Sequence, residues 1–301
     1  MNQTQENWKK GLVLSLVTVL FWSTLPISLK ISLSALDAMT LTWFRFLAAA
    51  VFTLVLLLNN HKIKQFMTLT SVQWLWLGLA AVMLIANYVL FLIGLEMTSP
   101  ANAQVFIQMA PLLMTLGGVL IFKESFSKMQ MLGVTSIIIG LSLFFKDQIE
   151  QIIASDYTLG IWVMFVAALT WAIYALIQKK LASALSSQSI LFFIYCFASL
   201  VLVFWSRFNA FGEINSTQWW AVGYACINTV IAYGAFAEAL NHWNASRVGM
   251  VLAITPVITL FAINSFAFFF PELMSAESIQ TFGYAGVVFI VSGSMLASLK
   301  K

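Results

Sequence analysis

The sequence predicts an all-α integral membrane protein with ten transmembrane helices in two inverted five-helix repeats. Three observations predict this fold class. Hydrophobic residues make up 61% of the chain and charged residues only 9%, whereas about a quarter of a soluble domain is charged. The apolar residues form long continuous runs, and several residues of the first half recur in the second half at a regular spacing. A soluble domain of this composition would expose more apolar surface than water tolerates.

Ten apolar runs each approach the roughly 20 residues that a helix needs to cross the hydrocarbon layer. The runs are continuous rather than alternating in polarity, which favours helices over the strands of a barrel. The predicted spans are 11–29, 38–58, 71–95, 101–122, 129–145, 158–178, 188–206, 217–240, 246–270 and 278–299. The first run is longer than a signal-peptide core and lacks a cleavage pattern, so we expect it to be retained as a span.

The lysines and arginines indicate the orientation of the chain. With the N-terminus in the cytoplasm and ten crossings, eleven of these residues fall in cytoplasmic segments and three in outer segments. Positive charge accumulates on the cytoplasmic side of membrane proteins. We therefore expect a multi-pass protein of the cell (inner) membrane with both termini cytoplasmic. The basic residues stand singly or in pairs, which excludes the basic run of a nucleic-acid patch.

An internal repeat divides the chain into residues 1–147 and 158–301. An offset of 149 or 145 residues relates three pairs: Trp22 with Trp171, Tyr88 with Tyr233, and Pro111 with Pro256. Five spans per repeat place the second repeat upside down in the membrane, which is the architecture of many secondary transporters. The last span of each half has two glycines seven residues apart, at 133 and 140 and at 286 and 293. Because positions seven apart share a helix face, we expect spans five and ten to pack closely.

Several stretches together resemble the EamA-type members of the drug/metabolite transporter superfamily. They are Phe21-Trp22-Ser23-Thr24 with Pro26, the stretch 170–174, the stretch 101–111 followed by Lys123-Glu124, and the paired glycines. The second half departs from the pattern, because Phe270-Pro271-Glu272 and a longer loop replace the Lys-Glu turn. The resemblance implies a central cavity lined by spans one, three, four, six, eight and nine, with spans five and ten at one side. It also implies export of metabolites such as amino acids, or of drugs.

Polar and aromatic side chains on the expected cavity spans are candidates for substrate binding. As a set they suit a neutral or zwitterionic organic solute, although for any single residue hydrogen bonding between helices is the favoured explanation. Gln104 and Gln108 lie one turn apart and share a face. The candidates are Trp22, Thr24, Asn87, Tyr88, Gln104, Gln108, Trp171, Tyr174, Asn228, Tyr233 and Glu238. Pro26, Pro111 and Pro256 are hinge candidates, because a proline frees a backbone carbonyl and bends its helix; a static kink is the alternative.

Two ionisable residues lie inside predicted spans, where charge is costly and usually functional. Arg45 in span two extends toward the membrane surface, caps a neighbouring helix, or acts as a counter-ion for an acidic group of the substrate. Its repeat counterpart is Ile194, and span two is expected at the periphery. Glu238 in span eight either pairs with Arg247 or His242 or takes part in substrate or proton binding. The sequence leaves both roles open.

These features predict a secondary transporter that moves a small organic solute by alternating access. The alternatives are a membrane-embedded enzyme and a receptor or scaffold. The chain has two histidines, His61 and His242, and lacks the sequence motifs of zinc proteases, serine hydrolases and ATP-driven pumps. Cys196 and Cys226 lie in apolar runs and are expected to be buried and free. We expect no catalytic residues, metal or cofactor. The expected partners are the lipid bilayer and a small-molecule substrate, with no nucleic acid, and the sequence is compatible with a monomer.

Overall fold

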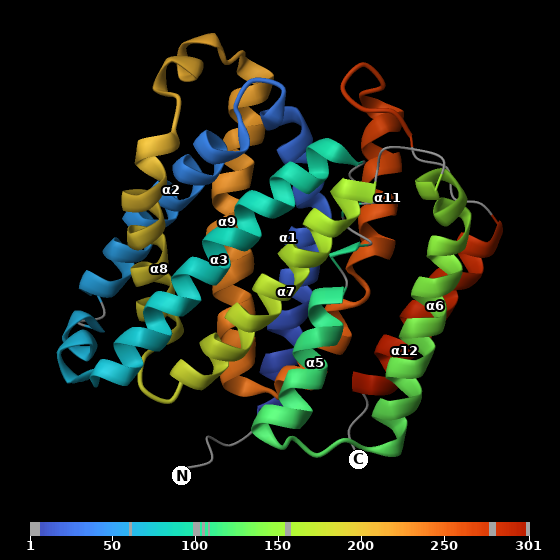
Figure 1. Cartoon of the computed structure of the whole chain (residues 1–301), viewed down its shortest axis with the longest axis horizontal. Coiled ribbons are helices and arrows are strands. Elements are labelled where there is room, and N and C mark those ends of the chain that lie inside the picture. Colours follow the sequence, from blue (N-terminus) through green and yellow to red (C-terminus); the bar gives the residue numbers. More distant parts are fainter. Residues whose placement is uncertain are drawn as a thin grey trace.

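The computed structural model describes residues 7–59, 62–98, 103, 106–107, 109–153, 158–276 and 281–298. These residues form helices and short connections, with no strand among them (Figure 1). Seven helical segments of the described chain are long and apolar enough to cross a membrane, and three shorter apolar helices occupy Met109–Phe122, Lys128–Phe144 and Phe282–Leu296. The prediction of an all-α membrane protein is therefore confirmed.

The helices follow the predicted apolar runs. The first half contains α1 (Trp8–Leu33), α2 (Ala38–Asn59), the 3-10 helix η1 (Lys62–Thr68), α3 (Ser71–Met97), α5 (Met109–Phe122) and α6 (Lys128–Ile153). The second half contains α7 (Thr158–Leu181), α8 (Ser187–Leu202), the 3-10 helices η2 (Val203–Trp205) and η3 (Phe208–Glu213), α9 (Ser216–His242), α10 (Ala245–Leu252), α11 (Thr255–Phe269) and α12 (Thr281–Ser298). We call the end of the bundle where α1 begins the Trp8 end, and the opposite end the Leu33 end.

Polar residues just before the apolar runs determine where several helices begin. In a capping box the side chain of the first residue accepts a hydrogen bond from the backbone three residues on, and a glutamine there bonds back. This satisfies N–H groups that a helix start otherwise leaves unpaired. The described helices have three such boxes: Thr70 with Gln73, Ser127 with Gln130, and Asn215 with Gln218.

The predicted span 246–270 is interrupted in its middle. A short turn at Ala253–Ile254 separates α10 from α11. Pro256 has no N–H to bond the carbonyl of Leu252, and the Thr255 hydroxyl donates to that carbonyl instead, at 2.5 Å. Two of the three hinge candidates, Pro256 and Pro111, lie in the first turns of α11 and α5. The third, Pro26, lies inside α1.

α6 and α12 pack along each other at one side of the bundle, at the right of Figure 1. A Cβ atom placed on Gly140 would lie 2.7 Å from the Gly286 carbonyl oxygen, and one on Gly286 would lie 2.5 Å from that of Gly140. A Cβ atom placed on Gly293 would likewise lie 2.5 Å from the Gly133 carbonyl oxygen. The expected close packing of these two spans through their glycines is therefore confirmed.

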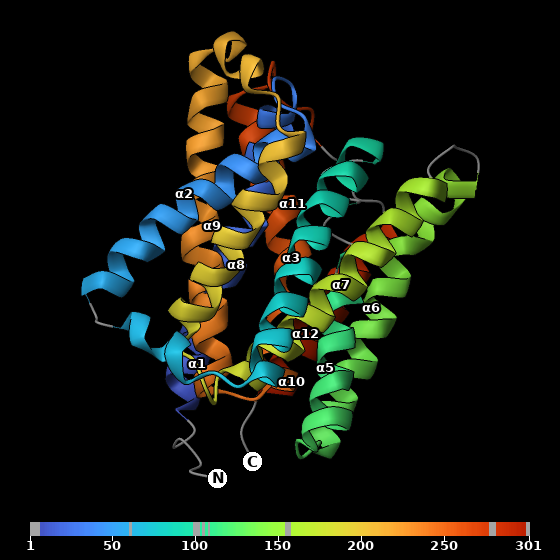
Figure 2. The same cartoon turned by 60° about the vertical axis from the view of Figure 1, so that its left-hand side comes forward.

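The remaining helices pack in pairs that join the two halves of the chain. α1 packs on α9, α3 on α7, and α2 on α8, while α5 crosses α10 (Figures 1 and 2). α1 also contacts α11 and α7 also contacts α5. These pairs meet around the middle of the bundle, where the aromatic residues of the candidate site lie.

Candidate functional site

Four of the predicted aromatic residues form a cluster at the centre of the bundle. The indole rings of Trp22 on α1 and Trp171 on α7 meet edge to face, with centroids 5.5 Å apart. Tyr88 on α3 and Tyr233 on α9 have ring centroids 5.3 Å apart, and Trp22 lies 5.2 Å from Tyr233. Each of the first two pairs joins residues that the repeat relates to each other. The cluster therefore lies where the two halves of the chain meet.

A cavity adjoins this cluster. It provides about 80 Å³ for the centres of water-sized molecules, several times the space that one water needs. Seven predicted residues line it: Trp22, Asn87, Tyr88, Trp171, Tyr233, Pro26 and Pro111. The other lining residues are Leu25, Leu29, Arg45, Phe91, Ile107, Ala110, Leu252 and Thr255. The walls are thus mainly apolar and aromatic with a few polar groups, as in sites that bind small organic molecules.

Arg45 is the charged residue among the described lining residues, and only 2% of its surface is exposed. Its Nε atom donates a hydrogen bond to the Thr229 hydroxyl at 3.0 Å. The guanidinium carbon lies 4.6 Å from the centroid of the Tyr88 ring, a cation–π distance. Of the three interpretations of Arg45, the structure excludes extension to the membrane surface.

Two asparagines tie the helix pairs beside the cavity. Asn87 on α3 donates to the backbone carbonyl of Ala167 on α7 at 2.9 Å, and Asn228 on α9 donates to that of Phe21 on α1 at 2.5 Å. Asn87 also lines the cavity, whereas Asn228 does not. The two amides therefore hold corresponding helix pairs, α3 with α7 and α9 with α1.

Four further predicted residues lie outside the cavity lining, namely Thr24, Tyr174, Asn228 and Glu238. The Thr24 hydroxyl contacts the Tyr224 hydroxyl and bonds the Leu20 carbonyl at 3.1 Å. Tyr174 is fully buried against Tyr233 and Phe236, and its hydroxyl has no partner among the described residues. The side-chain amide of Asn228 donates to the Phe21 carbonyl, as described above. Gln104 and Gln108 lie outside the described residues.

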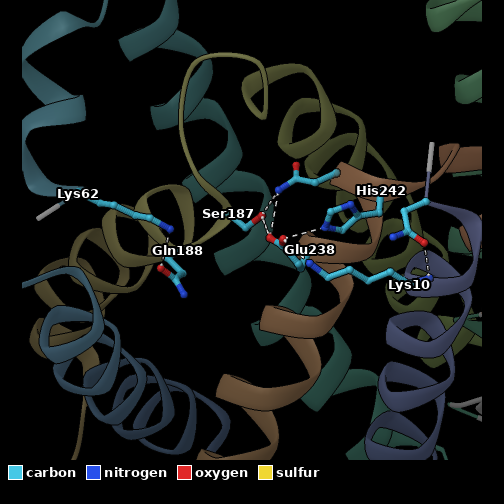
Figure 3. Close-up of polar contacts among 8 residues, drawn as sticks. Lys10, Lys62, Ser187, Gln188, Glu238 and His242 are labelled. Atoms are coloured by element: carbon cyan, nitrogen blue, oxygen red, sulfur yellow. Dashed lines mark hydrogen bonds and ion pairs between the residues drawn. The ribbon is translucent and has the colours of Figure 1, made fainter. Parts of the chain in front are cut away.

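Glu238 lies near the Trp8 end, in a polar cluster (Figure 3). Its carboxylate accepts hydrogen bonds from Ser187 at 3.0 Å and Asn241 at 3.2 Å, and it lies 3.1 Å from His242 Nε2. Lys10 Nζ lies 3.9 Å away. This carboxylate joins the start of α1 and the start of α8 to the end of α9. Glu238 therefore pairs with His242, which was one of its two expected roles, and it does not line the cavity.

A second polar cluster joins α5, α7 and α10 at the Trp8 end. Glu124 accepts hydrogen bonds from the backbone N–H groups of Ala245 at 2.9 Å and Ser246 at 3.0 Å, where α10 begins. Its carboxylate lies 3.4 Å from Lys179 Nζ, which donates to the Trp243 carbonyl at 3.0 Å. The side chain of Glu124 is only 7% exposed. A buried carboxylate thus caps one helix and pairs with another.

Sequence patterns do not single out Phe91 and Thr255 as cavity residues, and they leave the role of Arg45 open. Span two is expected at the periphery, yet α2 packs on α9 and the long side chain of Arg45 reaches inward. Thr255 has a signal in the sequence, since it directly precedes the repeated proline. Phe91 has none beyond its place one turn after Tyr88.

Comparison with known proteins gives a consistent picture. A model of the EamA-like transporter family matches residues 9–146 and 158–299. An uncharacterized transporter of Haemophilus influenzae is 32% identical over 290 residues, which cover 96% of this chain and 94% of that protein. The uncharacterized inner membrane transporter YhbE of Escherichia coli is 29% identical, with coverage of 96% and 91%. A crystal structure matches with a TM-score of 0.71 over 96% of both chains at 14% identity, which is a likeness of fold.

Proposed function

Because this chain belongs to the EamA-like transporter family and is a multi-pass membrane transporter, we propose that it is a secondary transporter that exports a small organic metabolite or drug by alternating access. The proposal includes ten crossings in two inverted repeats, both termini in the cytoplasm and no enzymatic activity. The central cavity between the repeats, with its repeat-related aromatic pairs, is the observation that carries it.

Reciprocal packing supports the inverted repeats. The offset from Gly133 to Gly286, and from Gly140 to Gly293, is 153 residues. Gly140 lies against Gly286, and Gly293 lies against Gly133. Replacing both glycines of the first contact by their counterparts at the offset of 153 residues therefore gives the second contact. A two-fold axis across antiparallel helices produces this exchange. The pairing of α1 with α9 and of α3 with α7 is the same exchange between other spans.

The cavity occupies one side of the aromatic cluster, which supports alternating access. Its lining residues Leu25, Leu29 and Phe91 lie on the Leu33 end of α1 and α3. By the offsets of 149 and 145 residues, their counterparts are Tyr174, Gln178 and Phe236. None of these three counterparts lines the cavity. The cavity therefore lies on one side of the repeat's meeting point, as expected for one of two exchangeable states.

The cluster around Glu124 supports closure of the Trp8 end. Glu124, Lys179 and the start of α10 join three helices that would have to separate for a passage to open there. With the termini in the cytoplasm, the structure corresponds to a state closed toward the cytoplasm. Charge-assisted hydrogen bonds in a buried place suit this role, because they are strong when made and individually breakable.

Cysteine accessibility tests this proposal without knowledge of the substrate. Phe91→Cys and Phe236→Cys form a matched pair of counterparts, to be made in a chain whose Cys196 and Cys226 are replaced by serine. In intact cells, a membrane-impermeant thiol reagent should label Phe91→Cys and not Phe236→Cys. In inverted vesicles, Phe236→Cys should be labelled, at a rate limited by opening of the Trp8 end. Equal labelling of both from one side would contradict alternating access.

A further inference from the structure

The proposed transport function leaves the chemical class of the solute open. The residues that line the cavity restrict that class. We propose that the cavity binds an organic monocarboxylate with an apolar or aromatic body, and that Arg45 is the group that recognises the carboxylate. This inference rests on the proposed function and deepens it. It departs from the neutral or zwitterionic solute that the sequence alone suggests.

Within the described part of the chain, the Arg45 guanidinium has no counter-ion. No carboxylate of the described residues lies within ion-pair distance of Arg45, which interacts there with Thr229 and Tyr88. A charge held inside a membrane protein without a partner is costly, and such residues mark ligand sites. A bound anion would supply the missing charge.

The guanidinium is held in a fixed orientation. Thr229 accepts the bond from Nε and donates its own proton to the Ala225 carbonyl at 2.8 Å. The Tyr195 hydroxyl bonds the Thr229 carbonyl at 3.3 Å, and the Tyr88 ring lies against the guanidinium. These contacts occupy Nε and one face, and no described residue accepts a bond from the two terminal nitrogens. That pair of nitrogens is the fork that binds a carboxylate with two parallel hydrogen bonds.

The rest of the lining selects among anions. Leu25, Leu29, Phe91, Trp22 and Trp171 present apolar and aromatic surface, which suits a hydrocarbon or aryl body. One cation neutralises one negative charge, so a monocarboxylate fits better than a phosphate dianion. Among the described lining residues none is acidic, so the ammonium group of an amino acid would be desolvated without a partner.

Matched ligands test the inference on the purified full-length protein. The probes are benzoate, phenylpropionate and indole propionate, each with its uncharged amide, together with phenylalanine and phenylpropylamine. Apparent affinities come from ligand-dependent thermal stability. We expect at least one carboxylate to bind about tenfold or more tightly than its amide, since charge-assisted bonds are worth at least that much. Phenylalanine and phenylpropylamine should bind more weakly than phenylpropionate.

Variants assign the effect to the residue. Arg45→Met should abolish the preference for acid over amide, and Arg45→Lys should retain part of it, because lysine keeps the charge and loses the fork. Arg207→Met is the matched control at an exposed arginine and should leave the preference unchanged. Elution as a single species and an unchanged melting temperature without ligand show that each variant is folded.

The outcomes separate this inference from the proposed function. The inference fails if no carboxylate binds, if the amine or phenylalanine binds as tightly as the acid, or if Arg45→Met keeps the preference. Flux of the bound carboxylate into proteoliposomes then tests transport. Binding that depends on Arg45 without flux would overturn the transport proposal and leave the anion site standing. Flux of other solutes that is insensitive to Arg45→Met would overturn the anion site and leave the transport proposal standing.

Discussion

Trp22 and Trp171 lie 149 residues apart in the chain, and their rings meet edge to face with centroids 5.5 Å apart. Phe46 and Tyr195, at the same offset, have centroids 5.6 Å apart. In the proposed inverted repeat, residues related by the two-fold axis touch only where they lie close to that axis. These contacts therefore mark where the two halves of the chain meet. The cavity adjoins this place, because Trp22 and Trp171 are among its lining residues.

The glycines between α6 and α12 should be intolerant of a methyl group. Gly286→Ala places a Cβ atom 2.5 Å from the Gly140 carbonyl oxygen, so the helices must separate, at a cost of roughly 1–3 kcal/mol. Gly223→Ala is the control, because no atom lies within 4 Å of its new Cβ and alanine favours the helix by about 1 kcal/mol. Thermal unfolding in detergent should show a lower melting temperature for Gly286→Ala alone. Equal melting of the two variants would contradict the close packing.

Lys123 should tolerate glycine better than valine. It ends α5 with φ = 53°, and the N–H of Glu124 folds back onto the Gly118 carbonyl at 3.3 Å. This left-handed conformation favours glycine and penalises β-branched residues. Lys123→Gly should be neutral or stabilising by up to about 1 kcal/mol, and Lys123→Val should be destabilising by about 1–2 kcal/mol. The two melting temperatures, measured side by side, check the prediction; a more stable valine variant would refute it.

Glu124→Gln should open the Trp8 end more often. The substitution removes the ion pair with Lys179 and weakens the cap on α10, whose N–H groups lie 2.9 and 3.0 Å from the carboxylate. Loss of such a buried pair is worth about 1.4 kcal/mol or more, a tenfold shift in population. Labelling of Phe236→Cys in inverted vesicles should therefore accelerate about tenfold. Glu272→Gln, at an exposed acid, is the control and should leave the rate unchanged.

Glu238→Gln should leave ligand affinity within about twofold. Glu238 is 39% exposed in its side chain and bonds Ser187, Asn241 and His242 away from the cavity lining. Exposed ion pairs of this kind contribute at most about 1 kcal/mol to stability. Ligand-dependent melting of the variant checks both statements. An affinity loss of tenfold or more would place Glu238 in substrate binding, as the sequence alone allowed.

The helical spans and the central aromatic pairs could be predicted from the sequence because both follow from local rules. Length and polarity define a span, and the repeat identified Trp22 and Trp171 as counterparts. The inward reach of Arg45 could not be predicted, because it depends on how α2 rotates against α9. Glu238 shows the same limit: the sequence placed it on a cavity helix, and its register on that helix turns it toward Lys10 and Ser187. Periodicity names the helix, whereas tertiary packing decides which residue faces the cavity.

The buried side chain of Gln178 lowers the stability of the arrangement that is closed at the Trp8 end. Both polar atoms of its buried side-chain amide lack a partner among the described residues, at a cost of about 1–3 kcal/mol for each unpaired group. Water entering from the Trp8 end would relieve that cost at the same time as it broke the contact of Glu124 with Lys179. In the proposed alternating-access cycle these two terms have opposite signs, so water that enters the Trp8 end offsets part of the cost of breaking the Glu124–Lys179 contact. The solute then has to supply only the remainder through tighter binding to one arrangement.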